Sequence, residues 1–119
     1  MGNKKIYDLE ERSFIFAKDV CEFCRKLPKN ISNLEYVKQV IRASSSIGAN
    51  YIEANESLGK KDFKMRVKIC RKEAKESAYW LRLIVETNNE KKFREEGIPL
   101  FQEAIELKKI FSSMIEKSK

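Results

Sequence analysis

The residues best suited to bind a charged partner lie between Lys60 and Tyr79, in the segment KKDFKMRVKICRKEAKESAY. From Lys60 to Lys75 this segment has eight basic and two acidic residues, a net charge of eight minus two, or +6, against +7 for the whole chain. On a helical projection at about 100° per residue, a row of cations shares one side of the helix. The row consists of Lys61, Lys64, Lys68, Arg71, Lys75 and Arg82. So many cations with so few carboxylates predict binding to the phosphate backbone of RNA or DNA.

Two other interpretations of this basic row stay open. Charges spaced along a helix are often only a solvated face, although that explains less easily a side that is nearly free of acid. The row could also dock an acidic protein or a nucleic-acid enzyme, which would make the chain a protein-interaction scaffold with no nucleic-acid binding of its own. The aromatic residues mostly lie on apolar stripes, so the sequence predicts neither a base-stacking platform nor the anchors of a membrane-surface helix.

The same helix carries an apolar stripe on its other side, formed by Phe63, Val67, Cys70, Ala74, Ala78 and Leu81. Similar periodicity predicts amphipathic helices over about 8–27, 34–56, 62–87 and 99–117. The sequence shows no strand signal, and its length of 119 residues suits one domain over 1–119. Together these features predict an all-α fold, an antiparallel up-down-up-down four-helix bundle.

Local signals indicate where these helices begin. Asp8 is expected to cap the first helix, and Ser32 or Asn33 the second. A polar connection is expected over 90–97, with Pro99 in the first turn of the last helix. The apolar arcs of the first and last helices are wide, which indicates either subunit contacts or ordinary scattered surface residues.

A polar cluster is predicted where the second and third helices meet, formed by Arg42, Asn50, Glu53, Glu73 and Glu76. Glu73 and Glu76 fall within the apolar arc of the third helix, where a carboxylate needs a partner. Arg42, Asn50 or Arg66 could supply that partner. The favoured interpretation is a structural hydrogen-bond network that fixes the register of the helices, and the alternative is a ligand or subunit contact.

The chain lacks the residues that most enzymes use. It has no His, which removes the commonest general base and the usual Ser-His and Cys-His pairs. It has no P-loop, and its three Cys cannot complete a zinc site without His. We therefore expect no catalysis, no metal and no cofactor, with the Cys as small buried hydrophobes. No apolar run approaches the roughly 20 residues of a membrane span and no signal peptide is evident, so a cytoplasmic location without membrane contact is expected.

Two segments of the chain carry a family resemblance, RASSSIGANYIEAN over 42–55 and KDFKMRVKICRKEAKESAYWL over 61–81. They resemble the bacterial four-helix-bundle proteins encoded in intervening sequences of large-subunit ribosomal RNA genes. That family includes the accessory variability proteins of diversity-generating retroelements. The resemblance spans nearly the whole chain, and the strings A-N-x-x-E and K-E-A-x-E-x-x-Y-W-L make it fairly specific.

This resemblance implies an up-down bundle that assembles as a ring-like homopentamer. For the retroelement branch it implies binding of nucleic acid and of a reverse transcriptase, whereas the molecular role of the ribosomal branch is unsettled. The sequence does not choose between the branches. The motif positions Asn50, Glu53, Glu73 and Glu76 carry over as structural rather than catalytic positions.

Overall fold

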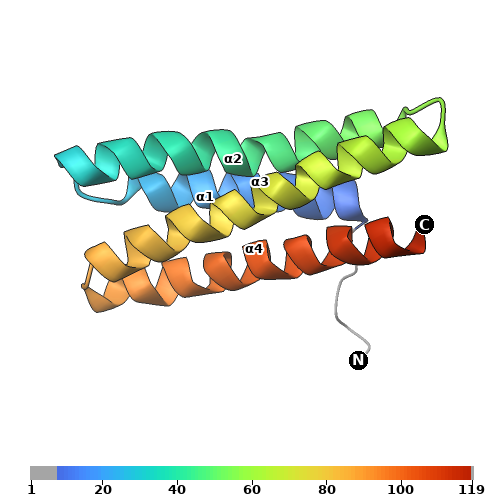
Figure 1. Ribbon diagram of the computed structural model, residues 1–119. Coiled ribbons are helices and arrows are strands. Elements are labelled where there is room, and N and C mark those ends of the chain that lie inside the picture. Colours follow the sequence, from blue (N-terminus) through green and yellow to red (C-terminus); the bar gives the residue numbers. More distant parts are fainter. Residues whose placement is uncertain (1–7, 119) are drawn as a thin grey trace.

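The computed structural model describes residues 8–118, and these form helices joined by short connections. The helices are α1 (Leu9–Arg25), α2 (Ile31–Asn55), α3 (Lys60–Thr87) and α4 (Lys91–Lys117). Residues 8–118 contain no strand, so the predicted all-α class is confirmed. Figure 1 shows the long helices lying side by side along a common direction.

The packing order of the helices is that of a bundle. Successive helices pack on one another, α1 on α2, α2 on α3 and α3 on α4. The first helix α1 also packs on the last helix α4. Within the described residues the backbones of α1 and α3 do not come close to each other, so these two helices lie diagonally across the bundle. The short connections make successive helices antiparallel, as predicted for a four-helix bundle. The outer side of α3 is therefore flanked only by α2 and α4.

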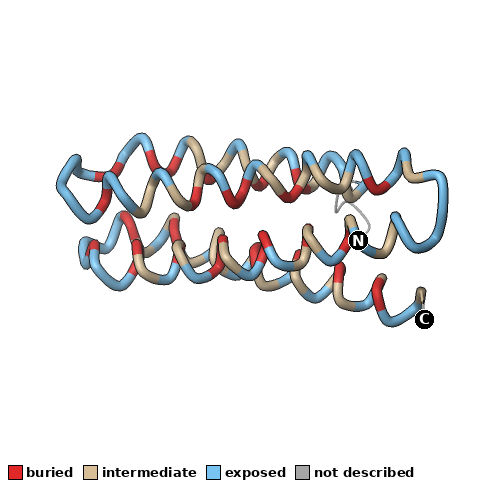
Figure 2. Tube along the Cα trace, turned by 45° about the horizontal axis from the view of Figure 1, so that its top comes forward, coloured by how far each residue is buried: buried red, intermediate tan, exposed pale blue. Residues whose placement is uncertain are grey.

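The core lies along the bundle axis and is rich in aromatic and aliphatic side chains. Figure 2 shows buried positions recurring along each helix between exposed ones, as amphipathic helices require. On α3, the predicted apolar positions Val67, Cys70, Ala74, Ala78 and Leu81 are all buried. The sixth predicted position, Phe63, is only half-buried and packs against the edge of the core.

The first helix begins where the sequence predicts, and the second does not. Asp8 caps α1, with its Oδ1 accepting a hydrogen bond of 2.8 Å from the backbone N–H of Glu11. The cap of α2 is Asn30, whose Oδ1 accepts from the backbone N–H of Asn33 at 2.8 Å. The prediction of Ser32 or Asn33 as the cap was wrong because the helix begins earlier, and Asn33 lies inside it with 2% exposure.

Asn33 instead joins two distant parts of the bundle. Its side-chain amide and that of Asn88, in the turn after α3, donate to each other's oxygens over 2.9 Å in both directions. The remaining amide hydrogens are donated to the backbone carbonyls of Pro28 and Ile84. This buried pair ties the start of α2 to the α3–α4 turn, and every amide N–H has a partner.

The last helix begins well before Pro99, so the predicted polar connection over 90–97 was wrong. α4 starts at Lys91, and its first turns are held in place by Phe93, which is 5% exposed, and by buried Gly97. Pro99 lies within the helix. Its ring leaves the carbonyl of Glu95 without its helical donor, but both residues are exposed and water can satisfy that carbonyl. Burial of Phe93 and Gly97 therefore favours a helix here, despite the polar composition of the segment and the proline that follows it.

Among the described residues, no helix has an apolar stretch long enough to cross a bilayer.

Candidate nucleic-acid interface

The six cations predicted on the third helix form one row on α3, here called the basic stripe: Lys61, Lys64, Lys68, Arg71, Lys75 and Arg82. The side chains at 64 and 71 are half-buried, and the other four are exposed. None of the six forms an ion pair with a carboxylate of residues 8–118. Their charges are therefore available to an external anion, and the half-buried stems hold two of the charges close to the helix.

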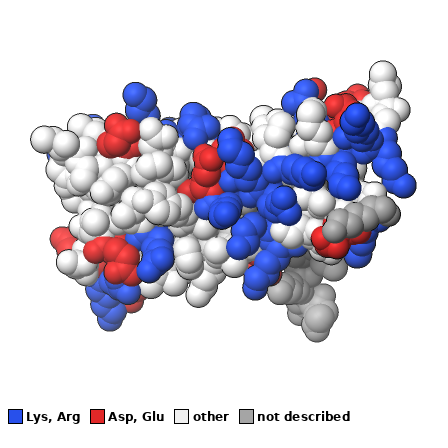
Figure 3. All heavy atoms as spheres, viewed as in Figure 1, with Lys and Arg blue, Asp and Glu red and all other residues white. Residues whose placement is uncertain are grey.

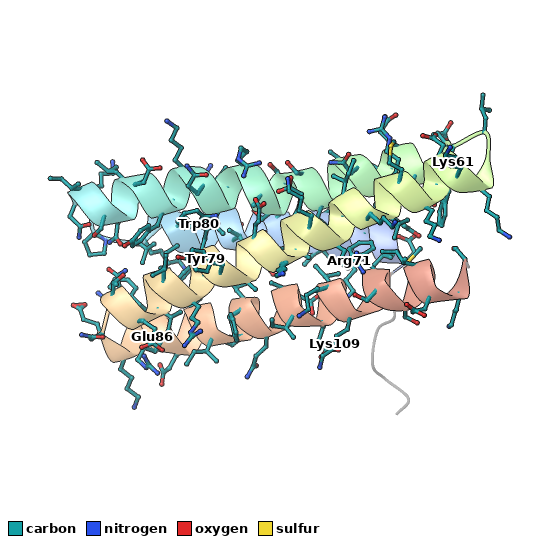
Figure 4. The ribbon with its side chains drawn as sticks, viewed as in Figure 1. Lys61, Arg71, Tyr79, Trp80, Glu86 and Lys109 are labelled. Atoms are coloured by element: carbon teal, nitrogen blue, oxygen red, sulfur yellow. The ribbon has the colours of Figure 1, made fainter. Side chains whose placement is uncertain are left out.

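The stripe belongs to a wider basic surface. Figure 3 shows Lys and Arg gathered over one half of the face that α3 presents, while the other half has fewer Lys and Arg and several Asp and Glu side chains. Figure 4 shows Lys109 of α4 on the same face as Arg71. Lys109 lies 3.7 Å from Glu106 on its own helix. The contribution of α4 was missed because a projection of one helix does not show which neighbour packs beside it.

Glu73 and Glu76, the carboxylates on the α2 side of the stripe, are paired with other cations. Arg42 Nη1 of α2 lies 3.6 Å from Glu73 Oε1, and Arg42 Nη2 donates to Glu76 Oε1 at 3.2 Å. Lys72 Nζ lies 3.7 Å from Glu76 Oε2. Glu73 is buried, with 6% exposure, whereas the Glu76 side chain is 36% exposed and lies at the rim. These pairs leave the basic stripe outside the α2–α3 ion-pair cluster.

The structure brings together three of the five residues predicted for the polar cluster, Arg42, Glu73 and Glu76, whereas within residues 8–118 Asn50 and Glu53 form no hydrogen bond or ion pair with these three. Arg42 joins Glu73 and Glu76, as described, and Asn50 accepts from Arg66 Nη1 at 3.4 Å. Asn50 also donates to the carbonyl of Ser46 at 2.9 Å. The Glu53 side chain is exposed and has no hydrogen-bond or ion-pair partner within residues 8–118, so the structure places it outside the cluster.

An open groove of about 530 Å³ lies between α2 and α3 at the end of the ion-pair cluster. It is lined by Gln39, Arg42, Lys72, Lys75, Glu76, Tyr79 and Trp80. Tyr79 is 59% exposed and is therefore an exception to the expectation that the aromatic residues mostly lie on apolar stripes. The signal was present in the sequence, because Tyr79 follows Lys75 by four residues and precedes Arg82 by three. The groove therefore adds an exposed aromatic ring to the basic stripe.

The buried thiols show no sign of reactive chemistry. Burial raises the pKa of Cys24 and of Cys70 to about 12, because a thiolate is poorly solvated there. A thiol with a raised pKa is a weak nucleophile and a weak metal ligand at neutral pH. Cys21 is half-buried on the same helix as Cys24. Within residues 8–118 no group of three or more Cys, Asp or Glu could hold a metal ion.

The fold and this surface define a small all-α bundle with a largely unpaired basic face. Residues 6–113 match the family described as 23S rRNA-intervening sequence protein, and the chain belongs to that family. This establishes the ribosomal-RNA part of the resemblance noted in the sequence.

A solved relative supports the same assignment. The chain is similar to the crystal structure, at 1.70 Å resolution, of a protein with unknown function from the S23 ribosomal protein family of Bacteroides thetaiotaomicron. The two chains are 30% identical and superpose with a TM-score of 0.76, over 89% of this chain and 96% of the relative. A search of curated proteins found no match.

Proposed function

We propose that this chain is a non-enzymatic, oligomeric helical bundle that binds the backbone of RNA or DNA through the basic stripe of α3. The observation that carries the proposal is the absence of ion pairs on the stripe within the described residues, although carboxylates are available nearby. The carboxylates on the α2 side of the stripe, Glu73 and Glu76, pair with Arg42 and Lys72 instead. A phosphate backbone supplies the missing counter-charges.

Lys and Arg side chains on a helix determine how the protein is expected to bind nucleic acid. Lys and Arg on a straight helix contact phosphate oxygens without reading the bases, so affinity depends little on sequence and strongly on salt. Such contacts release condensed counterions, which makes binding favourable at low ionic strength. The family description, an intervening-sequence protein of 23S rRNA, is consistent with an RNA context.

Oligomer formation is the second part of the proposal. Large apolar side chains are exposed on three helices, with Phe14 61%, Ile52 48% and Met65 49% exposed. Such side chains are suited to contacts between copies of the chain. A homopentamer is the assembly that the family resemblance implies. A ring would repeat the basic stripe in every subunit and so multiply the phosphate contacts along one nucleic acid.

Two cellular roles are compatible with nucleic-acid binding by this bundle. We propose action either in a ribosomal RNA context or as an accessory to a reverse transcriptase. The position of the gene separates these roles, because a reverse transcriptase next to a variable repeat favours the retroelement role. A position inside a ribosomal RNA gene favours the other.

A charge-reversal experiment tests the proposed interface. The variant combines Lys64→Glu, Lys68→Glu and Lys75→Glu, and its matched control combines Lys18→Glu, Lys29→Glu and Lys38→Glu. Both change the net charge equally, but the control positions lie on α1, the α1–α2 connection and α2. Binding to labelled RNA and duplex DNA is measured together with helicity and mass.

We expect the stripe variant to lose binding while it keeps its helicity and assembly, and the control to retain most of its affinity. If the two variants weaken binding equally, only net charge matters and the stripe is not the site. Unchanged binding by the stripe variant would contradict the proposal directly.

A second candidate function is a protein-interaction scaffold. The exposed apolar residues and the unpaired cations favour a partner that is apolar and acidic at once. In that case the wild-type chain binds neither RNA nor DNA at low salt, and an acidic partner protein is retained by the wild type but released by the stripe variant.

A further inference from the structure

Tyr79 lies within the row of cations rather than beside it. It follows Lys75 by one helical turn and precedes Arg82 by three residues, so along the α3 axis it is about 6 Å from the first and about 4.5 Å from the second. Figure 4 shows Tyr79 and Trp80 on the face that also carries Arg71. An exposed aromatic ring thus interrupts a track of unpaired cations.

The Tyr79 ring is held in place by its aromatic neighbours. It meets the ring of Trp80 edge-on, with centroids 5.2 Å apart and planes at 79°. Trp80 in turn lies 6.1 Å from the Tyr36 ring of α2, at 35°. Trp80 and Tyr36 are half-buried and pack against the core, whereas Tyr79 is 59% exposed. A supported ring with a free surface loses little conformational entropy when a planar ligand stacks on it.

The groove beside this ring has polar groups of both signs. Lys75 has no carboxylate partner within residues 8–118, while Arg42 and Lys72 are already paired with Glu76. A phosphate entering next to Glu76 would meet a carboxylate, so the position for a phosphate is at Lys75. Gln39 Nε2 donates to Glu35 Oε2 at 2.9 Å, and the amide oxygen of Gln39 can accept a hydrogen bond from the edge of a nucleobase.

We propose that the groove between α2 and α3 is a subsite for an unpaired nucleotide, with its base stacked on Tyr79 and its phosphate at Lys75. This inference rests on the proposed function of the basic stripe. It adds that the protein prefers single-stranded to duplex nucleic acid. In a duplex the faces of the bases are covered by neighbouring base pairs, so only unpaired bases can stack on a protein ring. The size of the groove, about 530 Å³, leaves room for one nucleotide.

The test compares two strands that share a backbone but differ in bases. One probe is a labelled oligothymidylate, and the other is an abasic strand of equal length, which presents phosphates without bases. The full-length wild type, Tyr79→Ala and Tyr79→Phe are titrated with both probes at low salt. Tyr79→Phe retains the ring and is the matched control, and both variants alter an exposed side chain, so their helicity should match that of the wild type.

We expect the wild type to bind oligothymidylate more tightly than the abasic strand. Loss of one stacked base should weaken oligothymidylate binding by Tyr79→Ala by about 5- to 150-fold, with abasic binding and salt dependence unchanged. Tyr79→Phe should bind both probes like the wild type.

Four outcomes would overturn the inference. Equal binding of both strands by the wild type, or an equal loss on both strands in Tyr79→Ala, would show that no base stacks there, while the basic stripe still binds phosphates. An equal loss in Tyr79→Phe and Tyr79→Ala would assign the effect to the hydroxyl group and not to the ring. Absence of binding to either strand would refute the proposed function as well, and would leave the groove to a protein partner.

Discussion

At the residue scale, the buried amide pair of Asn33 and Asn88 connects positions that are distant in the sequence. Each side chain donates one hydrogen bond to the other and one to a backbone carbonyl. Removing one amide leaves the other with unsatisfied polar atoms at a buried site. Such an atom costs about 1–3 kcal/mol, whereas the loss of both partners together costs less than the sum of the single losses.

We therefore expect Asn33→Ala and Asn88→Ala each to lower the free energy of unfolding by about 1–3 kcal/mol. The double variant should be destabilised by less than the sum of the two single changes, which denaturant unfolding can measure in a double-mutant cycle. Additive effects would show that the two amides do not depend on each other.

Some side-chain environments could be predicted from the sequence and others could not. The sequence predicted that Glu73 would need a partner, because a carboxylate on an apolar arc must be compensated, and it offered Arg42, Asn50 or Arg66. In the structure Arg42 Nη1 lies 3.6 Å from Glu73 Oε1. The pair of Asn33 and Asn88 was not predicted, since no local pattern links two residues 55 positions apart. The exposed position of Tyr79 was not predicted, because the helical projection was used to place the cations and the apolar stripe and not this aromatic residue.

At the scale of elements, α4 shows a conflict between local composition and tertiary packing. The sequence over 90–97 is polar and precedes a proline, so local signals favour a connection. The structure makes it helical because Phe93 and Gly97 face the core. The boundaries of α1 and the end of α3 at Thr87 were predicted well, since apolar periodicity and polar ends agree there.

Gly97 of α4 faces side chains of both α1 and α3. A Cβ atom added to Gly97 would lie 2.6 Å from Val85 Cγ2 and 2.9 Å from Phe23 Cζ, both on buried side chains. We expect Gly97→Ala to lower the free energy of unfolding by about 1–2 kcal/mol, because overpacking outweighs the better helix propensity of Ala.

Gly48 provides the control for this change, since it lies inside α2 and its added Cβ would be 3.4 Å from Ser13 Cβ. Gly48→Ala should leave the free energy of unfolding unchanged or raise it by up to about 1 kcal/mol, and denaturant unfolding of both variants measures the difference. A stabilising Gly97→Ala would show that α4 can move away from α1 and α3 at little cost.

At the scale of the whole molecule, the diagonal position of α1 leaves the outer face of α3 uncovered. The sequence predicted this bundle from four apolar stripes, and it predicted the basic stripe from the spacing of its cations. It could not predict which helix flanks the stripe, because packing order is not a local property. The structure supplies that order, and with it the extension of the basic face to Lys109 and the groove beside Tyr79.

The salt dependence of binding tests the central claim most directly. If all six cations of the basic stripe contact duplex phosphates, the logarithm of the binding constant should fall against the logarithm of salt with a slope of about −5 per subunit. That slope corresponds to a loss of roughly 10³-fold in affinity between about 50 and 200 mM salt. A single Lys68→Ala variant should reduce the slope by about 1. Measured slopes near zero, or a slope that Lys68→Ala leaves unchanged, would contradict the claim that this stripe binds nucleic acid.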